Sequence, residues 1–253
     1  MRLLILIILT TSLTTWGQTI KELNPTLGYL VDKSPEGELK FNQQKEKCNK
    51  VWGRPQNTLT DEEKKTLEYC NENFDGVENY YDILGPGCSW YCGGGLGTQT
   101  ASSELKSQGQ NNYSATNAHD LNYKTAWIEG VSGYGIGEYL IYNFPPENPR
   151  ITKIIIVNGY VKSDKAWKEN SRVKQIKLYI DDKPFAILNL KDTKNEQIFT
   201  LDNPIGQGER MDMKKLKTLP SWTMKFEIMD IYKGDRYDDT AITEIYFDGI
   251  DVH

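Results

Sequence analysis

Asp120, Asn122 and Thr125 stand in one short polar run with the spacing Asp-x-Asn-x-x-Thr, and an aromatic residue, Trp127, follows them. The run is too polar for a strand and too rich in Asn for a helix interior, which predicts a tight loop. Carboxylate, hydroxyl and backbone carbonyl oxygens in a compact loop suit Ca²⁺, which takes about six to eight oxygen ligands. The alternative is an Asx-turn that leads into a strand in which Trp127 is buried.

A second group of candidate residues lies between two expected strands, in the segment 160–172. A sugar presents hydroxyl groups and an apolar C–H face, so it suits an aromatic ring beside planar polar side chains. The segment supplies Tyr160, Trp167, Asn170 and Arg172 as candidate glycan-binding residues. The alternative is that Trp167 packs beneath the loop and Arg172 pairs with a nearby acid. Two further candidate clusters are the segment Tyr232–Asp239 and the pair Trp90 and Tyr91.

Motifs for catalysis are weak. The glycine run 93–97 lacks the spacing of a phosphate-binding loop, and the chain has no Gly-x-Ser-x-Gly. His119 and His253 are the two histidines, and neither forms a convincing pair with Ser or Cys. A glycosidase needs two carboxylates about 5–9.5 Å apart, which 35 acidic residues leave open. We therefore expect a binding protein and not an enzyme. A glycan hydrolase is the third hypothesis, after a glycan-binding protein and a protein-binding module.

Composition excludes some partners. The 253 residues suffice for one core with an appendage, and the net charge is −5. The pI is about 5.3 and the mean hydropathy is −0.60, which indicates a well-hydrated surface. Since no basic stripe offsets the acidic balance, nucleic acid and anionic membranes are not expected as partners.

The first 17 residues have the pattern of a signal peptide, with Arg2, the apolar run Leu3–Leu9 and the small residue Gly17. We expect cleavage before Gln18 and a secreted or extracytoplasmic protein. The apolar run falls short of the roughly 20 residues that span a bilayer, and no second one follows, so membrane insertion is not expected.

Export favours disulfides for the four cysteines, which allow three pairings. We favour Cys48–Cys70, within the N-terminal segment, and Cys88–Cys92, which would close a small loop. A zinc site is the alternative, but the spacings lack paired Cys-x-x-Cys motifs and histidines are scarce.

Residues 18–87 are expected to form a small helical segment. Thr60 and Glu63 form a capping box, from which a helix should run to Cys70 or Asn73. A second helix is expected over 41–48, and the turn at 84–87 marks the boundary to a domain over 88–253.

After Cys92 the pattern becomes one of strands and turns. Trp222 to Ile228 alternate apolar and polar residues, whereas Ile151–Asn158 is continuously apolar in its second half and should be central and covered on both faces. The fold class expected is mainly β, an antiparallel jelly-roll sandwich. The expected strands are Glu138–Phe144, Ile151–Asn158, Val173–Asp181, Phe185–Leu190, Glu196–Leu201, Trp222–Asp230 and Ala241–Asp248.

Residues 88–253 resemble the NADase-type glycan-binding domain, a discoidin-like module of the coagulation factor 5/8 C-domain type. The stretches that carry the resemblance are Cys88–Gly94, Ala101–Ser103, Asn117–Gly130, Gly135–Glu138, Asn158–Tyr160, Asn170–Lys174 and Tyr232–Gly249. No NADase activity follows from the family name.

The resemblance implies a structural calcium ion, held by the side chains of Asp120, Thr125 and Glu244. It adds the backbone carbonyls of Asn117, Asn122 and Thr243 as ligands. The resulting hypothesis is a secreted, non-catalytic glycan-binding protein whose partner is a glycan or glycoconjugate. A protein-binding or cell-surface adhesion module on the same scaffold is the alternative, with a protein partner at the cell surface.

Overall fold

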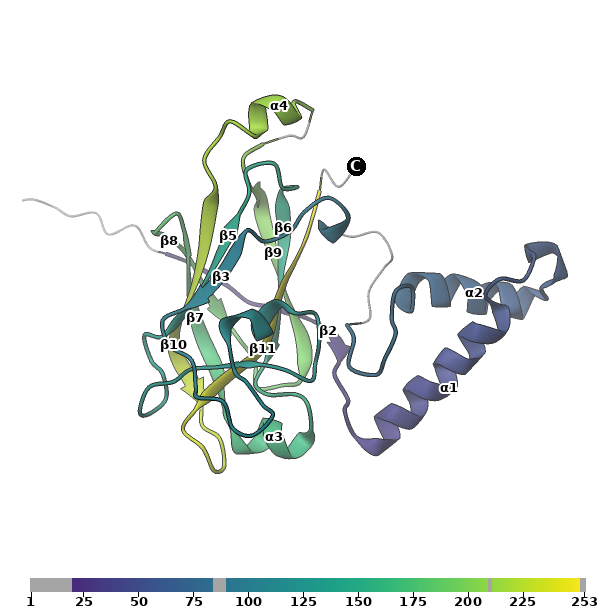
Figure 1. Ribbon diagram of the computed structural model, residues 1–253, viewed down its shortest axis with the longest axis horizontal. Coiled ribbons are helices and arrows are strands. Elements are labelled where there is room, and N and C mark those ends of the chain that lie inside the picture. The colour runs from purple at the N-terminus through teal and green to yellow at the C-terminus, as the bar shows by residue number, and fades with distance from the viewer. Residues whose placement is uncertain (1–19, 84–89, 209–210, 251–253) are drawn as a thin grey trace, which may run out of the picture.

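The computed structural model describes residues 20–83, 90–208 and 211–250, and the expected mainly β sandwich is confirmed (Figure 1). All seven expected strands are present. The predicted signal peptide, the turn at 84–87 and Cys88, hence the Cys88–Cys92 pairing, lie outside the described residues. No helix within the described ranges is long and apolar enough to cross a membrane.

Five strands make the first layer, in the order β8-β7-β10-β5-β3, and every pair within it is antiparallel. A two-residue turn joins β7 to β8, at Asp181 and Asp182, with φ of 47° and 60°, which Asp tolerates. The strands are β3 (Thr98–Ala101), β5 (Tyr139–Phe144), β7 (Ser171–Ile180), β8 (Lys183–Asn189) and β10 (Trp222–Tyr232).

The second layer has the order β9-β6-β11. The short β4 pairs with the start of β11, at Ala241 and Ile242, whereas β6 pairs with β11 from Glu244 onward. β6 lies between two partners, and its four consecutive residues Ile154 to Val157 are all buried, as expected for a covered central strand. A short parallel contact between β11 and β7 joins the layers. The strands are β4 (Trp127–Ile128), β6 (Ile151–Asn158), β9 (Asn195–Ile205) and β11 (Thr240–Gly249).

The core fills the space between the two layers. Phe247 of β11 lies 5.6 Å from the Tyr142 ring and 5.2 Å from the Phe144 ring of the opposite layer, measured between centroids. The inward residues of β10 are buried as their alternation predicts, and Trp127 is fully buried. Short helical segments cap the layers: η2 (Trp90–Cys92), η3 (Ala115–His119), α3 (Asp164–Glu169) and α4 (Met213–Leu216).

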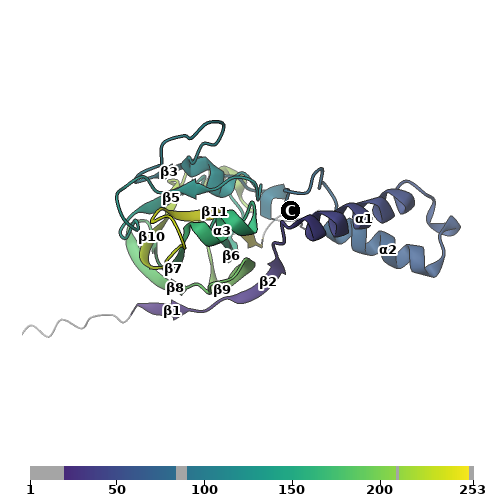
Figure 2. The ribbon, with the colours of Figure 1, turned by 90° about the horizontal axis from the view of Figure 1, so that it is seen from below.

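The N-terminal segment begins with two strands that its sequence pattern does not predict. β1 (Lys21–Leu23) pairs with β8 in parallel, and β2 (Thr26–Leu30) pairs with β9 in antiparallel orientation. The segment 18–87 is therefore not wholly helical, because its first part joins the edges of the two layers. Figure 2 shows this strap running along one side of the sandwich.

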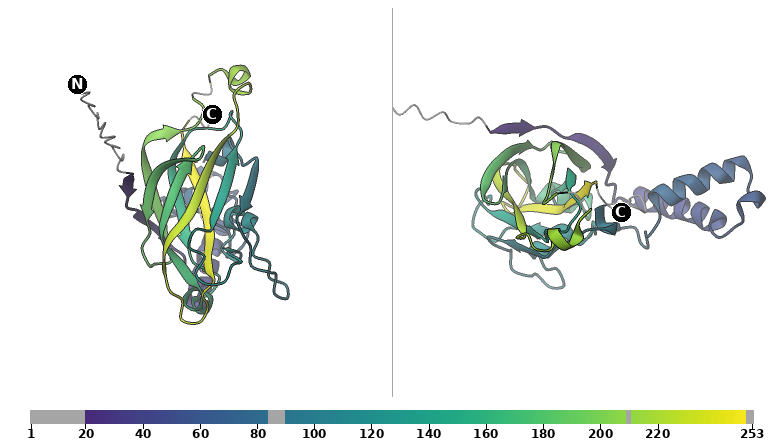
Figure 3. Two further views of the ribbon diagram at one scale, coloured as in Figure 1. Left: turned by 90° about the vertical axis from the view of Figure 1, so that its left-hand side faces the viewer. Right: turned by 90° about the horizontal axis from the view of Figure 1, so that it is seen from above.

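A helical hairpin follows the strap and projects from the sandwich (Figure 3). Its helices are α1 (Pro35–Val51) and α2 (Asp61–Asn73), connected by η1 (Gln56–Thr58). The predicted disulfide Cys48–Cys70 is confirmed and joins them. Such a small core gains from a covalent link, because the hairpin buries little apolar surface. The first helix is longer than expected because Ser34 accepts a hydrogen bond from the Gly37 amide and Pro35 occupies the first turn.

The predicted capping box of α2 is confirmed. Thr60 Oγ1 accepts from the Glu63 amide at 3.2 Å, and the Glu63 carboxylate accepts from the Thr60 amide at 2.8 Å. Replacing Thr60 with Ala should lower the free energy of opening of this helix by about 1 kcal/mol, measured by amide hydrogen exchange. Thr66→Ala within the same helix is the control and should not lower it, since Ala is the better helix former. Equal effects of both changes would contradict the cap's contribution.

The chain after α2 returns to the sandwich and lies on the second layer. The Tyr81 carbonyl accepts from the Tyr123 amide at 2.7 Å, and the Ile83 amide donates to the Leu121 carbonyl at 3.4 Å. Lys33 stands 4.0 Å from the centroid of the Tyr80 ring and 4.8 Å from that of Tyr123. Burial lowers the pKa of Lys33 to about 8. These contacts fix the N-terminal segment against the polar loop 117–127.

Candidate functional site

The polar loop is folded around the Asp120 carboxylate. Thr125 Oγ1 donates to Asp120 Oδ2 at 2.6 Å, and the Asn122 amide donates to Asp120 Oδ1 at 3.1 Å. Leu121 between them has φ of 58°, in the left-handed region, which turns the chain sharply. The loop therefore gathers the carboxylate and the hydroxyl at one point, as the spacing of the run predicts.

Glu244 reaches this point from β11, across 122 residues of sequence from Asn122, whose amide donates to Glu244 Oε1 at 2.8 Å. Glu244 is fully buried, and its Oε2 has no hydrogen-bond partner. Burial first, and then the neighbouring Asp120 carboxylate, raise the pKa of Glu244 well above its usual range. A buried carboxyl group with one unpartnered oxygen thus lies beside the exposed carboxylate of Asp120.

The donor set fits a calcium ion. Two carboxylates, one hydroxyl and neutral carbonyls are the oxygen ligands that Ca²⁺ prefers. Within the described ranges no cluster of three or more His, Cys, Asp and Glu side chains is gathered for a metal, so the neutral oxygens would have to complete the shell.

Asn117 and Thr243 can contribute only their backbone carbonyls, as the resemblance implies. The Asn117 side-chain amide donates to the carbonyls of Asn112 and Ala126, both at 3.0 Å. The Thr243 hydroxyl donates to the Gly159 carbonyl at 2.6 Å. Both side chains are therefore used in holding neighbouring backbone.

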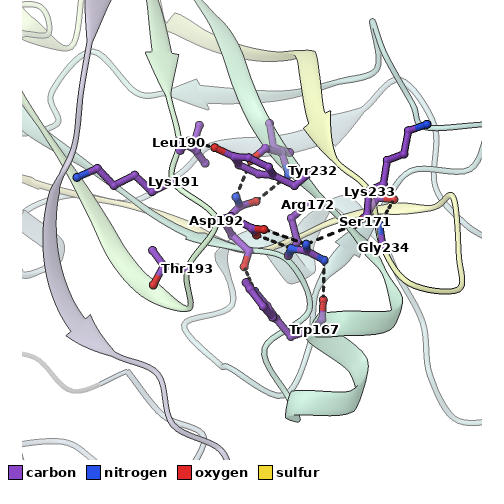
Figure 4. Close-up of polar contacts among 12 residues, drawn as sticks. Trp167, Ser171, Arg172, Leu190, Lys191, Asp192, Thr193, Tyr232, Lys233 and Gly234 are labelled. Atoms are coloured by element: carbon purple, nitrogen blue, oxygen red, sulfur yellow. Dashed lines mark hydrogen bonds and ion pairs between the residues drawn. The ribbon is translucent and has the colours of Figure 1, made fainter.

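The four predicted glycan-binding residues lie on and beside α3, at one end of the sandwich (Figure 1), and Figure 4 shows two of them, Trp167 and Arg172. Arg172 is the second residue of β7, with only 7% of its surface exposed. Its Nε and one terminal nitrogen donate to the two oxygens of Asp192, at 2.7 and 3.1 Å. The remaining donors reach the carbonyls of Trp167 at 3.2 Å, Asn170 at 2.9 Å and Lys233 at 3.4 Å.

A guanidinium has five N–H groups, and these five hydrogen bonds engage all of them. Arg172 therefore joins three loops, namely the α3 loop, the β8–β9 loop with Asp192, and the β10–β11 loop with Lys233. Sequence patterns gave no signal for Asp192, a single acid in a charged loop. The geometry favours the alternative in which Arg172 pairs with a nearby acid.

The other three predicted residues also serve the packing of this end. The Arg172 guanidinium lies 4.4 Å from the centroid of the half-buried Trp167 ring, and Trp167 Nε1 donates to the Asn158 carbonyl at 3.0 Å. Tyr160 is buried, and its ring lies 6.3 Å from that of Tyr113. Asn170 caps α3 through its amide, which donates to the Ala166 carbonyl at 2.8 Å.

The exposed groups at this end come from the segment Tyr232–Asp239, one of the two further candidate clusters. The backbone amides of Arg236 and Tyr237 donate to the Glu169 carbonyl at 3.2 and 2.8 Å, which docks the β10–β11 loop on α3. Tyr237 is 39% exposed, and the Arg236 guanidinium lies 5.0 Å from its ring centroid. An aromatic face and a forked donor are thus presented to solvent on fixed backbone.

The third candidate cluster is divided by the structure. Trp90 is fully buried in the core, where its Nε1 donates to the Pro149 carbonyl at 2.8 Å, so its ring cannot serve as a platform for sugar. Tyr91 lies instead beside β11, where its hydroxyl accepts from the Phe247 amide and it lines a cleft together with Tyr246.

Comparison with solved structures finds several carbohydrate-binding modules. The CBM32-1 and CBM32-2 domains of Clostridium perfringens ZmpB are 12% identical over 61% of this chain, with a TM-score of 0.40, and this chain covers 34% of theirs. CpGH89CBM32-5 of the same organism, solved with GalNAc-β-1,3-galactose, is 14% identical over 60% of this chain and 94% of its own, with a TM-score of 0.41. A family 35 module from an environmental isolate is 11% identical, covering 62% of this chain and 88% of its own, with a TM-score of 0.31. No curated protein matches the chain.

These structural scores are low, so the family assignment rests on the sequence match. The family model of the NAD glycohydrolase translocation F5/8 type C domain matches residues 90–248, which is most of the sandwich and more than half of the chain. The matched range contains the Asp120–Glu244 site and the loops that Arg172 joins, and leaves the strap and the helical hairpin outside it. The chain therefore belongs to the family of NAD glycohydrolase translocation F5/8 type C domains.

Proposed function

We propose that this chain is a secreted, non-catalytic glycan-binding protein with a structural calcium site. The glycan would bind at the end of the sandwich where α3 and the β8–β9 and β10–β11 loops meet. The observation that carries the proposal is that Arg172 holds three loops together at the end of the sandwich where the Tyr237 ring and the Arg236 guanidinium are exposed. Preorganised loops lose little conformational entropy on binding, which suits a small polar ligand.

Tyr237 and Arg236 are the residues proposed to contact the sugar. The Tyr237 ring offers a face for the C–H groups of the sugar, and Arg236 offers paired donors to its hydroxyls. Arg172 and Asn170 act as positioning residues, and Trp167 offers the sugar only the part of its ring that Arg172 leaves exposed. Tyr160 supports the loop from below.

The calcium proposal rests on the unpartnered oxygen of Glu244 beside the Asp120 carboxylate. Asp120, Thr125 and Glu244 would hold the ion with their side chains, and Asn117, Asn122 and Thr243 with their carbonyls. The ion would supply positive charge that offsets the two carboxylates. These residues would thereby fasten the polar loop to β11, a structural role for the ion.

The same carboxylates argue against a hydrolase at this site. A glycosidase keeps its two carboxyl groups about 5–9.5 Å apart, so that a sugar or a water fits between them. Glu244 is instead fully buried and therefore inaccessible to a substrate.

Export is supported by two observations. The N-terminal residues have the signal-peptide pattern, and the Cys48–Cys70 bond requires an oxidising environment to persist.

Calorimetric titration with the hits of a glycan array tests the proposed site. A single site should bind with a dissociation constant of roughly 0.1–1 mM, because a small polar ligand buries little apolar area. Tyr237→Ala and Arg236→Ala should each raise this constant about tenfold, the equivalent of about 1.4 kcal/mol. Tyr69→Ala is the matched control, since Tyr69 of α2 is 45% exposed and lies outside these loops.

Equal affinity in all three variants would show that the glycan does not bind at these loops. An array without any hit, together with specific capture of a protein at the cell surface, would favour the adhesion module instead. Turnover of a bound oligosaccharide would favour the hydrolase.

A further inference from the structure

A cleft of about 570 Å³ lies between the N-terminal segment and the outer face of the second layer, away from the loops around α3. Its size is within the range of about 300–1,000 Å³ that is usual for small-molecule sites. Asp75, Gly76 and Ile83 of the N-terminal segment form one wall, and Tyr91 and Leu121 contribute to the others. The cleft therefore exists only where the N-terminal segment meets the sandwich.

The floor of the cleft is a row of side chains from three adjacent strands. Ile198 of β9 is paired with Ile155 of β6, and Ile155 with Tyr246 of β11. The three side chains point outward from the second layer and line the cleft. They form an apolar floor with an aromatic ring at one edge, which suits the C–H face of a sugar.

Hydrogen bonds hold the two tyrosine rings of the cleft in place. The Tyr246 hydroxyl donates to Glu196 Oε1 at 2.7 Å. The Tyr91 hydroxyl accepts from the Phe247 amide at 3.1 Å. Rings that are fixed before binding lose little rotational freedom when a ligand stacks on them.

Beside the floor lies an ion pair that could recognise hydroxyl groups. Lys153 Nζ and Asp248 Oδ2 are 2.6 Å apart, and Asp248 Oδ1 accepts from the Gly249 amide at 2.8 Å. The two side chains remain 44% and 36% exposed, so a ligand can reach both. A donor beside an acceptor matches two adjacent sugar hydroxyls.

The charge of the lining selects among sugars. The lining has one basic residue, Lys153, and four acidic ones: Asp75, Asp82, Glu196 and Asp248. An acidic sugar would meet net repulsion in such a cleft, whereas a neutral one would not.

We infer that this cleft is a second carbohydrate site, which takes a short neutral oligosaccharide and rejects sialylated or sulfated ones. The inference rests on the proposed function for its ligand class but uses a different surface. The N-terminal segment completes the site, which gives the segment a role in binding.

Methyl-resolved NMR of the full chain with labelled isoleucines tests the inference. The probes are the neutral disaccharides lactose, cellobiose, maltose and chitobiose, with sialyllactose as the acidic counterpart of lactose. At least one neutral disaccharide should shift the methyl signals of Ile155 and Ile198, while Ile141 on the outer face of β5 stays unchanged. Sialyllactose should leave all three unchanged.

Two variants locate the binding. Ile155→Trp should fill the floor of the cleft, and Lys153→Met should remove the hydrogen-bond donor. Each variant should lower the affinity of the cleft for the disaccharide about tenfold. Ile141→Trp is the matched control and should bind as the wild type does. Lys153 is partly exposed, so Lys153→Met keeps the test decisive if Ile155→Trp does not fold.

The outcomes separate the two proposals. In one outcome no probe shifts the Ile155 and Ile198 signals, while Tyr237→Ala still lowers the affinity for an array hit. This result would overturn the inference of a second site in the cleft and leave the proposed function intact. Cleft shifts that persist in Tyr237→Ala would establish the second site independently of the loops. Stronger cleft shifts with sialyllactose than with lactose would overturn the charge argument and the inference with it.

Discussion

Saturating calcium should raise the free energy of unfolding of the wild-type chain by about 4.1 kcal/mol when the free ion is about 1,000 times its dissociation constant. An ion that binds only the folded state stabilises it by mass action, and the Asp120–Glu244 site exists only in the folded chain. Urea unfolding in calcium and in EDTA measures the difference. An unchanged midpoint, with no ion bound in either condition, would refute the site.

Variants of the two carboxylates should behave differently from each other. Asp120→Ala should abolish the response to calcium, because it removes the carboxylate around which the loop folds. Glu244→Gln should also abolish it, yet in EDTA the variant should be about 1–3 kcal/mol more stable than the wild type at neutral pH, since it removes a buried carboxylate whose Oε2 has no hydrogen-bond partner. Destabilisation by Glu244→Gln in EDTA would show that the buried charge is satisfied without an ion.

The pH dependence of the metal-free chain has a defined direction. Because the pKa of Glu244 is raised in the folded state, the folded chain binds this proton more tightly than the unfolded chain. The contribution of Glu244 to stability is therefore complete below the ordinary pKa of Glu and is lost as the pH rises towards the folded-state value. Glu244→Gln in EDTA should remove this loss from a series of urea titrations.

Arg172→Ala should lower the free energy of unfolding by about 3 kcal/mol, because it leaves three carbonyls and the Asp192 carboxylate without their partner. The figure is below the upper range for buried pairs, since Asp192 is 39% exposed and water can hydrate it. The three loops should also become more mobile, seen as faster amide exchange at Asn170 and Lys233.

The matched control is Arg236→Ala at the same end of the sandwich. Its ion pair with Glu169 spans 3.5 Å and the Arg236 side chain is 60% exposed, so the loss should stay below about 1 kcal/mol. Arg172→Ala with unchanged stability but lost glycan binding would return Arg172 to the role of a direct sugar ligand.

Local patterns in the sequence determined most of the sandwich and the hairpin. The alternation of Trp222 to Ile228 and the continuous apolar run in Ile151–Asn158 follow from burial on one face or two, which a strand's period of two makes visible. The capping box of Thr60 and Glu63 is equally local. The Cys48–Cys70 pairing followed from the closeness of the two cysteines in one small segment.

The short strands β1 to β4 escaped prediction for a related reason. β1 and β2 lie at the edges of the layers with mostly exposed side chains, so their sequences carry no apolar alternation. α3 escaped because its six residues expose no apolar stripe, and its start depends on one bond from the Ala166 amide to Ser163.

The candidate sites divide in the same way. By itself, the sequence determined that Asp120 and Thr125 converge, since they are only five positions apart in one short loop. Only the tertiary structure decided that Glu244 meets them and that Asp192 engages Arg172, because strand order brings these partners together across long stretches of chain. The side chain of Arg172 could bind a sugar or a carboxylate equally well. The tertiary structure decided for the carboxylate, because it places Asp192 within hydrogen-bond distance of the guanidinium.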